Sequence, residues 1–120
     1  MERERGRYIA FEAICSNEMA FKELTTAIWR EIYTLFGEHG TSRAGLWMMS
    51  FISQSRDRGD DNHIETKNIL RYRGILRTNH RSINTVRISL AFLTEINGKS
   101  ILINIIGISG TLKGAQKKKN

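Results

Sequence analysis

Four stretches of the chain carry apolar residues in patterns typical of β-strands. They are Arg7–Ser16, Leu46–Ser55, Ile69–Thr78 and Ser100–Ser109. Two further stretches repeat apolar residues every three to four positions, as amphipathic helices do. The first begins near Phe21, with Ser16 or Asn17 as its cap, and ends at Gly37; the second runs from Ser82 or Asn84 to near Ile96. The Asn97-Gly98 pair then predicts a tight turn into the last strand.

Alternation along the strands separates a core face from an open face. We expect core residues Ile9, Phe11, Ala13 and Cys15 in the first strand and Leu70, Tyr72, Gly74 and Leu76 in the third. The opposite face then carries Tyr8, Glu12, Arg71, Arg73 and Arg77, with Leu102, Asn104, Ile106 and Ile108 from the last strand. Three guanidinium groups on one face cannot all be buried without partners, so this face must meet water or an anion.

The order strand, helix, strand, strand, helix, strand predicts an α+β fold of the ferredoxin-like or RRM-like open-sandwich type. Its antiparallel sheet would have four strands, with the first and third in the centre and both main helices on one face. The 120 residues fit one domain, with a flexible N-terminus over residues 1–6 and a basic tail over residues 114–120. Gly110–Asn120 could form a short helix, but its three terminal lysines favour a partly disordered basic arm. Apolar residues on the open face indicate that a terminal helix or a protein partner covers part of it; they are Ile14, Ile75, Leu102 and Ile106.

Positive charge is concentrated in the second half of the chain. The net charge is +7, yet residues 1–68 hold nine basic and eleven acidic side chains, whereas residues 69–120 hold ten basic ones and Glu95 alone as an acid. Such a surface suits a polyanion, and nucleic acid fits better than an anionic membrane surface. The aromatic signature of RNA-recognition modules is absent from the third strand, where Tyr72 lies on the core side, so generic stacking of single strands is not expected.

Other chemistry is weakly indicated. Cys15 lies within an apolar strand and reads as a buried structural thiol, which favours a reducing cytoplasm. No apolar run reaches the length of a membrane span, and no secretory signal is visible at the N-terminus. The polar loop Arg56–Lys67 lacks the spacing of a calcium loop, and His39, His63 and His80 lack the spacing of metal ligands. We therefore expect no protein-bound metal and no catalytic side chain.

Several blocks of sequence match a known family. They include Arg7-Tyr8-Ile9 with Phe11, Ile28-Trp29, Phe36-Gly37-Glu38 with Gly40-Thr41-Ser42, Gly74-Ile75-Leu76-Arg77 and Val86-Arg87 with Leu90. The most specific block runs from Glu95-Ile96-Asn97-Gly98-Lys99 to Gly107-Ile108-Ser109-Gly110-Thr111-Leu112-Lys113. Over almost its whole length the chain resembles the Pop-five type of ribonuclease P protein subunit of archaea and eukaryotes.

The resemblance implies a subunit of the endoribonuclease that removes the 5′ leader from precursor tRNA. It implies that catalysis belongs to the RNA and its Mg²⁺ ions. The implied partners are the ribonuclease P RNA, precursor tRNA and the larger subunit with a TIM-barrel-like fold, with a homodimer inside a heterotetramer as a further expectation. The residues we expect to contact RNA are Arg7, Tyr8, Arg71, Arg73, Arg77, Lys99, Lys113, Lys117, Lys118 and Lys119. The alternative is a basic protein-interaction or RNA-binding scaffold outside tRNA processing.

Overall fold

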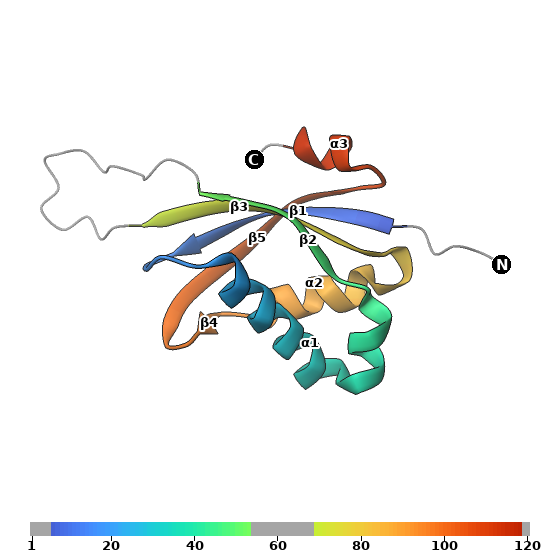
Figure 1. The fold of residues 1–120 in the computed structure, drawn as a ribbon, viewed down its shortest axis with the longest axis horizontal. Coiled ribbons are helices and arrows are strands. Elements are labelled where there is room, and N and C mark those ends of the chain that lie inside the picture. Colours follow the sequence, from blue (N-terminus) through green and yellow to red (C-terminus); the bar gives the residue numbers. More distant parts are fainter. Residues whose placement is uncertain (1–5, 54–68, 119–120) are drawn as a thin grey trace, which may run out of the picture.

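An antiparallel sheet carries two helices on one side and a short third helix on the other (Figure 1). The computed structural model describes residues 6–53 and 69–118, without the side chains of residues 41–43. The strands are β1 (Gly6–Cys15), β2 (Trp47–Ser53), β3 (Leu70–Asn79), β4 (Glu95–Ile96) and β5 (Lys99–Ser109). The helices are α1 (Phe21–Ala44), α2 (Ile83–Phe92), which follows a 3-10 turn over His80–Ser82, and α3 (Leu112–Gln116).

The strand order is β2-β3-β1-β5-β4, and every pairing is antiparallel. The predicted α+β class and the interior position of β1 and β3 are confirmed. The prediction of four strands is wrong, because α2 ends at Phe92 and Glu95–Ile96 pairs with Lys99 and Ser100 as a fifth strand. The predicted turn at Asn97-Gly98, with φ values of 51° and 80°, closes this short hairpin.

The core lies between the sheet and the two long helices. Ile9 and Phe11 of β1 are fully buried, as are Leu24, Ile28 and Ile32 of α1. Val86 and Leu90 of α2 complete this layer. Each such side chain contributes about 1.5–3 kcal/mol through burial, so this layer holds the helices against the sheet.

Two local features of the chain differ from the sequence-based expectation. Helix α1 continues to Ala44 after a break at Gly37 (φ 75°), so the predicted helix end is real but a second helical segment replaces the predicted loop Gly37–Gly45. The residue that caps α1 is Ala20 and not Ser16 or Asn17. The predicted loop Arg56–Lys67 lies outside the described residues.

A bulge changes the face assignment in β5. Ala10 pairs with Gly107, but its neighbour Phe11 pairs with Ile105, which leaves Ile106 as the extra residue. Alternation therefore reverses beyond this point, and Ile108 lies opposite Ile9 and packs against the core. The prediction that Ile108 shares the open face with Leu102 is wrong for this reason.

Helix α3 covers part of the sheet face opposite α1 and α2 (Figure 1). Thr111 caps it, its Oγ1 accepting a 3.0 Å hydrogen bond from the backbone N–H of Gly114. Ala115 is fully buried against Ala10 and Ile75. The predicted basic tail therefore begins as a short helix packed on the sheet, and Lys117 and Lys118 follow directly after it.

Candidate nucleic-acid interface

The three arginines of β3 lie on the sheet face that carries α3. Arg71 donates a 3.4 Å hydrogen bond to Oε1 of Glu12, whose side chain is almost completely buried. Arg77 lies in register with Tyr8, and its guanidinium packs against the backbone of Gly6. Arg73 has a buried Nη2 atom that makes no hydrogen bond within the described residues. The predicted arginine face exists, and its three members differ in how far their charge is already satisfied.

Helix α3 adds further positive charge to the same side of the protein. Lys113, Lys117 and Lys118 are exposed on or directly after the helix. The aliphatic part of Lys118 lies across Gly107 of β5, which leaves no room there for a side chain. The structure thus places these lysines on the same side of the sheet as the β3 arginines; Lys119 lies outside the described residues.

Two aromatic residues lie in register with Arg77 across the sheet. Trp47 pairs with Arg77, and Arg77 pairs with Tyr8, so the three form one row across β2, β3 and β1. Trp47 is 67% exposed, whereas Tyr8 packs beside Leu112 of α3. Sequence reasoning missed Trp47 because a bulge near Met49 in β2 shifts the alternation that would have fixed its face. Its place directly after the Gly45-Leu46 turn was the available signal.

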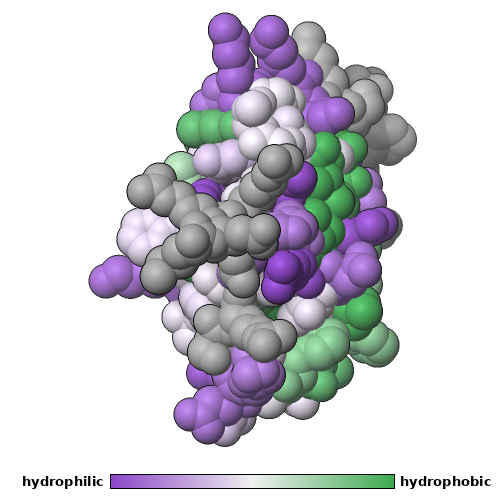
Figure 2. All heavy atoms as spheres, turned by 90° about the vertical axis from the view of Figure 1, so that its right-hand side faces the viewer, coloured by the Kyte–Doolittle hydropathy of each residue, from purple (hydrophilic) through white to green (hydrophobic). Residues whose placement is uncertain are grey.

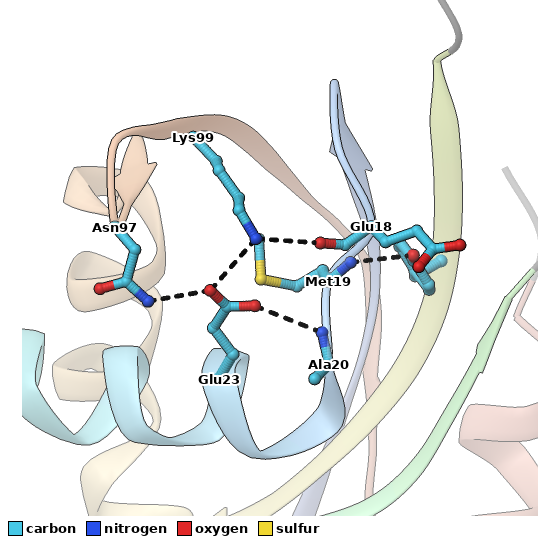
Figure 3. Close-up of polar contacts among 7 residues, drawn as sticks. Glu18, Met19, Ala20, Glu23, Asn97 and Lys99 are labelled. Atoms are coloured by element: carbon cyan, nitrogen blue, oxygen red, sulfur yellow. Dashed lines mark hydrogen bonds and ion pairs between the residues drawn. The ribbon is translucent and has the colours of Figure 1, made fainter.

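Two of the expected RNA-contacting residues lie elsewhere. Arg7 pairs with the fully buried Thr78, which places it on the helix side of the sheet, and it donates a 3.0 Å hydrogen bond to the carbonyl of Gly6. Lys99 lies at the opposite end of β5, where its Nζ contacts Glu18 O at 3.4 Å and Glu23 Oε2 at 3.5 Å (Figure 3). The register therefore places Arg7 on the other side of the sheet from the β3 arginines, with its guanidinium near Gly110, and places Lys99 at the other end of β5.

Glu23 is the centre of the cluster around Lys99. It accepts a 2.8 Å hydrogen bond from the side-chain amide of Asn97, and a weaker one of 3.5 Å from the backbone N–H of Ala20 (Figure 3). The Asn97 hydrogen bond, above all, holds the pKa of Glu23 below its ordinary value of 4.5. This cluster ties the β4–β5 turn to the start of α1, and so has a structural role.

Replacing Glu23 by glutamine should make stability less dependent on pH in the acid range. A carboxyl whose folded pKa is lowered stabilises the fold above its unfolded pKa, and that stabilisation disappears as pH falls through the folded pKa. Urea unfolding of the chain at neutral pH and below pH 4.5 measures the difference. The wild type should lose more stability between the two conditions than Glu23→Gln, with the exposed Glu38→Gln as the control; equal losses would show that the cluster contributes nothing.

The four residues expected on a partner surface divide into two pairs. Ile75 is 4% exposed, and Ile106 packs beside it under α3. Ile14 and Leu102 lie opposite each other further along the sheet, and Leu102 is 59% exposed. The terminal helix therefore covers the first pair, and the second pair remains on the surface.

Hydrophobic side chains also gather away from the basic side. In Figure 2 hydrophilic residues dominate the top, the side of the sheet that carries α3, and hydrophobic residues form a strip down the right half. A shallow groove of about 550 Å³ lies between α2 and β5, lined by Asn84, Arg87, Ile88, Ala91 and Ile105. Within the described residues, no strand pairs with the outer edge of β5 beyond Ser100.

Metal-ligating and nucleophilic side chains are two features that could support catalysis in the described part of the chain. Residues 6–53 and 69–118 contain no cluster of three or more metal-ligating side chains. Cys15 is buried, as predicted, and burial together with the nearby Glu23 raises the pKa of its thiol to about 11. The thiol therefore stays protonated at neutral pH and is a poor nucleophile. No helix in these residues is both long and apolar enough to cross a membrane.

A sequence profile decides the family to which this chain belongs. The profile of the Rpp14/Pop5 family matches residues 7–119. The chain belongs to the Rpp14/Pop5 family. The match includes all five strands and all three helices apart from the first residue of β1. The resemblance seen in the sequence is confirmed.

Curated relatives agree with this assignment. The chain is 32% identical over 116 residues to ribonuclease P protein component 2 of Pyrococcus furiosus, covering 97% of this chain and 83% of the relative. It is 32% identical over 115 residues to the protein of the same name from Methanobrevibacter smithii, covering 96% and 88%. A chain in the cryo-EM structure of yeast ribonuclease MRP has a TM-score of 0.51 at 14% identity, with 93% of this chain and 79% of that one covered. This last likeness concerns the fold alone.

Proposed function

We propose that this Rpp14/Pop5 protein is a protein component of ribonuclease P, which binds and supports the catalytic RNA during removal of the 5′ leader from precursor tRNA. Family membership and the relatives' names support the complex. The observation that carries the role of this chain is the gathering of Arg73, Arg77 and the α3 lysines on one side of the sheet. The chain takes part in an endoribonuclease whose chemistry is done by RNA.

The contact with RNA is electrostatic in this proposal. Arginine guanidinium and lysine ammonium groups neutralise phosphates and release the counterions bound to the RNA. The cations assigned to this contact are Arg71, Arg73, Arg77, Lys113, Lys117, Lys118 and Lys119. Tyr8 lies among them, whereas Arg7 and Lys99 are left out because they lie elsewhere in the fold. Mg²⁺ is assigned to the RNA, and precursor tRNA is reached directly or through that RNA.

Protein partners occupy other surfaces in this proposal. The larger ribonuclease P subunit with a TIM-barrel-like fold and a second copy of this chain are the two proteins assigned. The unpaired outer edge of β5 and the neighbouring groove at Ile88 support a protein contact there, since such edges accept a further strand. Cytoplasmic location stays a prediction.

Salt dependence tests the RNA contact. Binding of the chain to ribonuclease P RNA, measured by filter retention over a range of monovalent salt, should give a log–log slope of several units, because each neutralised phosphate contributes about 0.7–0.9. A protein-interaction scaffold with a solubilising tail would give a flat slope. That result would favour the alternative function and remove the basis of this proposal.

A further inference from the structure

The pocket beside α3 combines an unsatisfied donor with apolar walls. It has a volume of about 280 Å³ and lies on the open face between β2, β3 and α3. Ser50 and Ile52 of β2, Arg73 and Ile75 of β3 and Gln116 of α3 line it. Arg73 also has a buried Nη2 atom that makes no hydrogen bond within the described residues.

A buried guanidinium nitrogen without a hydrogen-bond partner indicates that an acceptor for it is missing from the described residues. Leaving a buried donor unsatisfied costs about 1–3 kcal/mol, and more for a charged group, so such an atom needs a physical explanation, and a bound acceptor is one. Glu12, directly opposite Arg73 in the ladder, accepts a hydrogen bond from Arg71 through its Oε1 atom. Arg73 therefore keeps a donor that the described residues leave unsatisfied.

The walls select what that ligand can be. A bare phosphate would meet Arg73 but would leave Ile52, which is 64% exposed, facing water. A nucleobase has flat apolar faces that fit between aliphatic side chains and an edge rich in acceptors. Arginine most often reads guanine, through its O6 and N7 atoms. The Ser50 hydroxyl and the Gln116 amide can each donate or accept at the remaining positions of the edge.

We propose that this pocket, formed by Ser50, Ile52, Arg73, Ile75 and Gln116, binds one unpaired guanine of the RNA. The inference rests on the proposed function, and adds base recognition to a contact that phosphates alone would make without reading sequence. Lys117 directly follows Gln116, so the backbone of a strand whose base enters the pocket would pass near the α3 lysines. Because α3 supplies one wall, the pocket exists only while α3 is packed on the sheet.

Short RNAs that differ in one position test this directly. The full chain, labelled at isoleucine methyl groups and glutamine amides, would be titrated by NMR with UUGUU, UUUUU and a pentamer whose central nucleotide is abasic. We expect UUGUU to shift the methyl signals of Ile52 and Ile75 and the side-chain amide of Gln116. It should bind about tenfold more tightly than the abasic pentamer, because one arginine–guanine pair changes affinity by about this factor or more.

Three variants distinguish recognition of guanine in the pocket from attraction of RNA by positive charge. Arg73→Gln should remove the preference for UUGUU, and Gln116→Ala should reduce it. Arg77→Gln removes an equal charge from the same face of β3, and should weaken all three pentamers alike while leaving the preference intact. Unchanged methyl signals in the core, at Ile9 and Ile28, would show that each variant is folded.

The outcomes distinguish this inference from the function on which it rests. Equal binding of all three pentamers, with shifts at Gln116 reproduced by inorganic phosphate, would overturn the guanine site and leave a phosphate site. Binding to ribonuclease P RNA without any shift at Ile52, Ile75 or Gln116 would also overturn it while the proposed function stands. If the chain binds neither the pentamers nor that RNA, both fail.

Discussion

Replacing Lys113, Lys117 and Lys118 together by glutamine should weaken binding to ribonuclease P RNA and lower the slope of log affinity against log salt by about 2–3 units. The three side chains are exposed on or after α3, so each is free to neutralise one phosphate. Leu112 and Ala115 make the buried apolar contact of α3 with the sheet, and of the three lysines Lys118 adds its aliphatic part across Gly107, which glutamine retains in part. The variant should therefore fold normally and lose charge alone.

A charge-matched variant makes this test specific. Lys22 and Arg30 of α1 and Arg87 of α2 are equally exposed, but they lie on the helices that cover the other side of the sheet. Replacing these three by glutamine changes the net charge by the same amount. It should leave the slope within about one unit of the wild type. Equal losses in the two variants would mean that the RNA follows net charge and does not use the α3 side.

Replacing Phe11 by alanine should lower the free energy of unfolding by about 3–5 kcal/mol. Phe11 is the largest fully buried side chain in the centre of β1, and its ring fills the space above Gly74 of β3. A Cβ atom at position 74 would meet the Phe11 ring far inside van der Waals contact, so the two positions are matched in size. Urea unfolding measures the loss, which is a large part of the ~5–15 kcal/mol available to a small domain.

Two further variants check the physical reason for this loss. Phe92→Ala removes a ring that is 63% exposed and should cost far less than Phe11→Ala. Gly74→Ala should be destabilising by about 1–3 kcal/mol in the wild type, and less so in a Phe11→Leu background, where the methyl group has room. A Phe11→Ala loss similar to that of Phe92→Ala would contradict the assignment of the core.

Local patterns in the sequence were sufficient for much of the fold. Strict alternation in β1 and β3 placed Ile9, Phe11, Tyr72 and Leu76 in the core, where they are 0–8% exposed. Gly37 correctly predicted the end of the first helical segment, because glycine readily adopts the positive φ value found there. These features follow from the period of side chains along one element, which a single sequence displays.

The remaining features depend on contacts between elements. The bulge at Ile106 is decided by the pairing of β1 with β5, and it reverses the face of Ile108. Gly107 is a local sign of a bulge, but it does not say which residue is the extra one. Strand β4 has two residues, which is too short for a pattern. The pocket on the open face could not be predicted for the same reason. Alternation placed Arg73 on that face, but Ser50 and Gln116, which also line the pocket, come from two distant segments of the chain.

Reconstitution of precursor-tRNA cleavage tests the central claim most directly. The cognate ribonuclease P RNA and the larger protein subunit would be assayed at low Mg²⁺ with no addition, with this chain, and with its Lys113, Lys117 and Lys118 variant. We expect cleavage to depend on the chain, with the variant active only at a higher concentration or lower salt. Cleavage that proceeds equally well without the chain would contradict its role as a component of ribonuclease P, whatever its affinity for RNA.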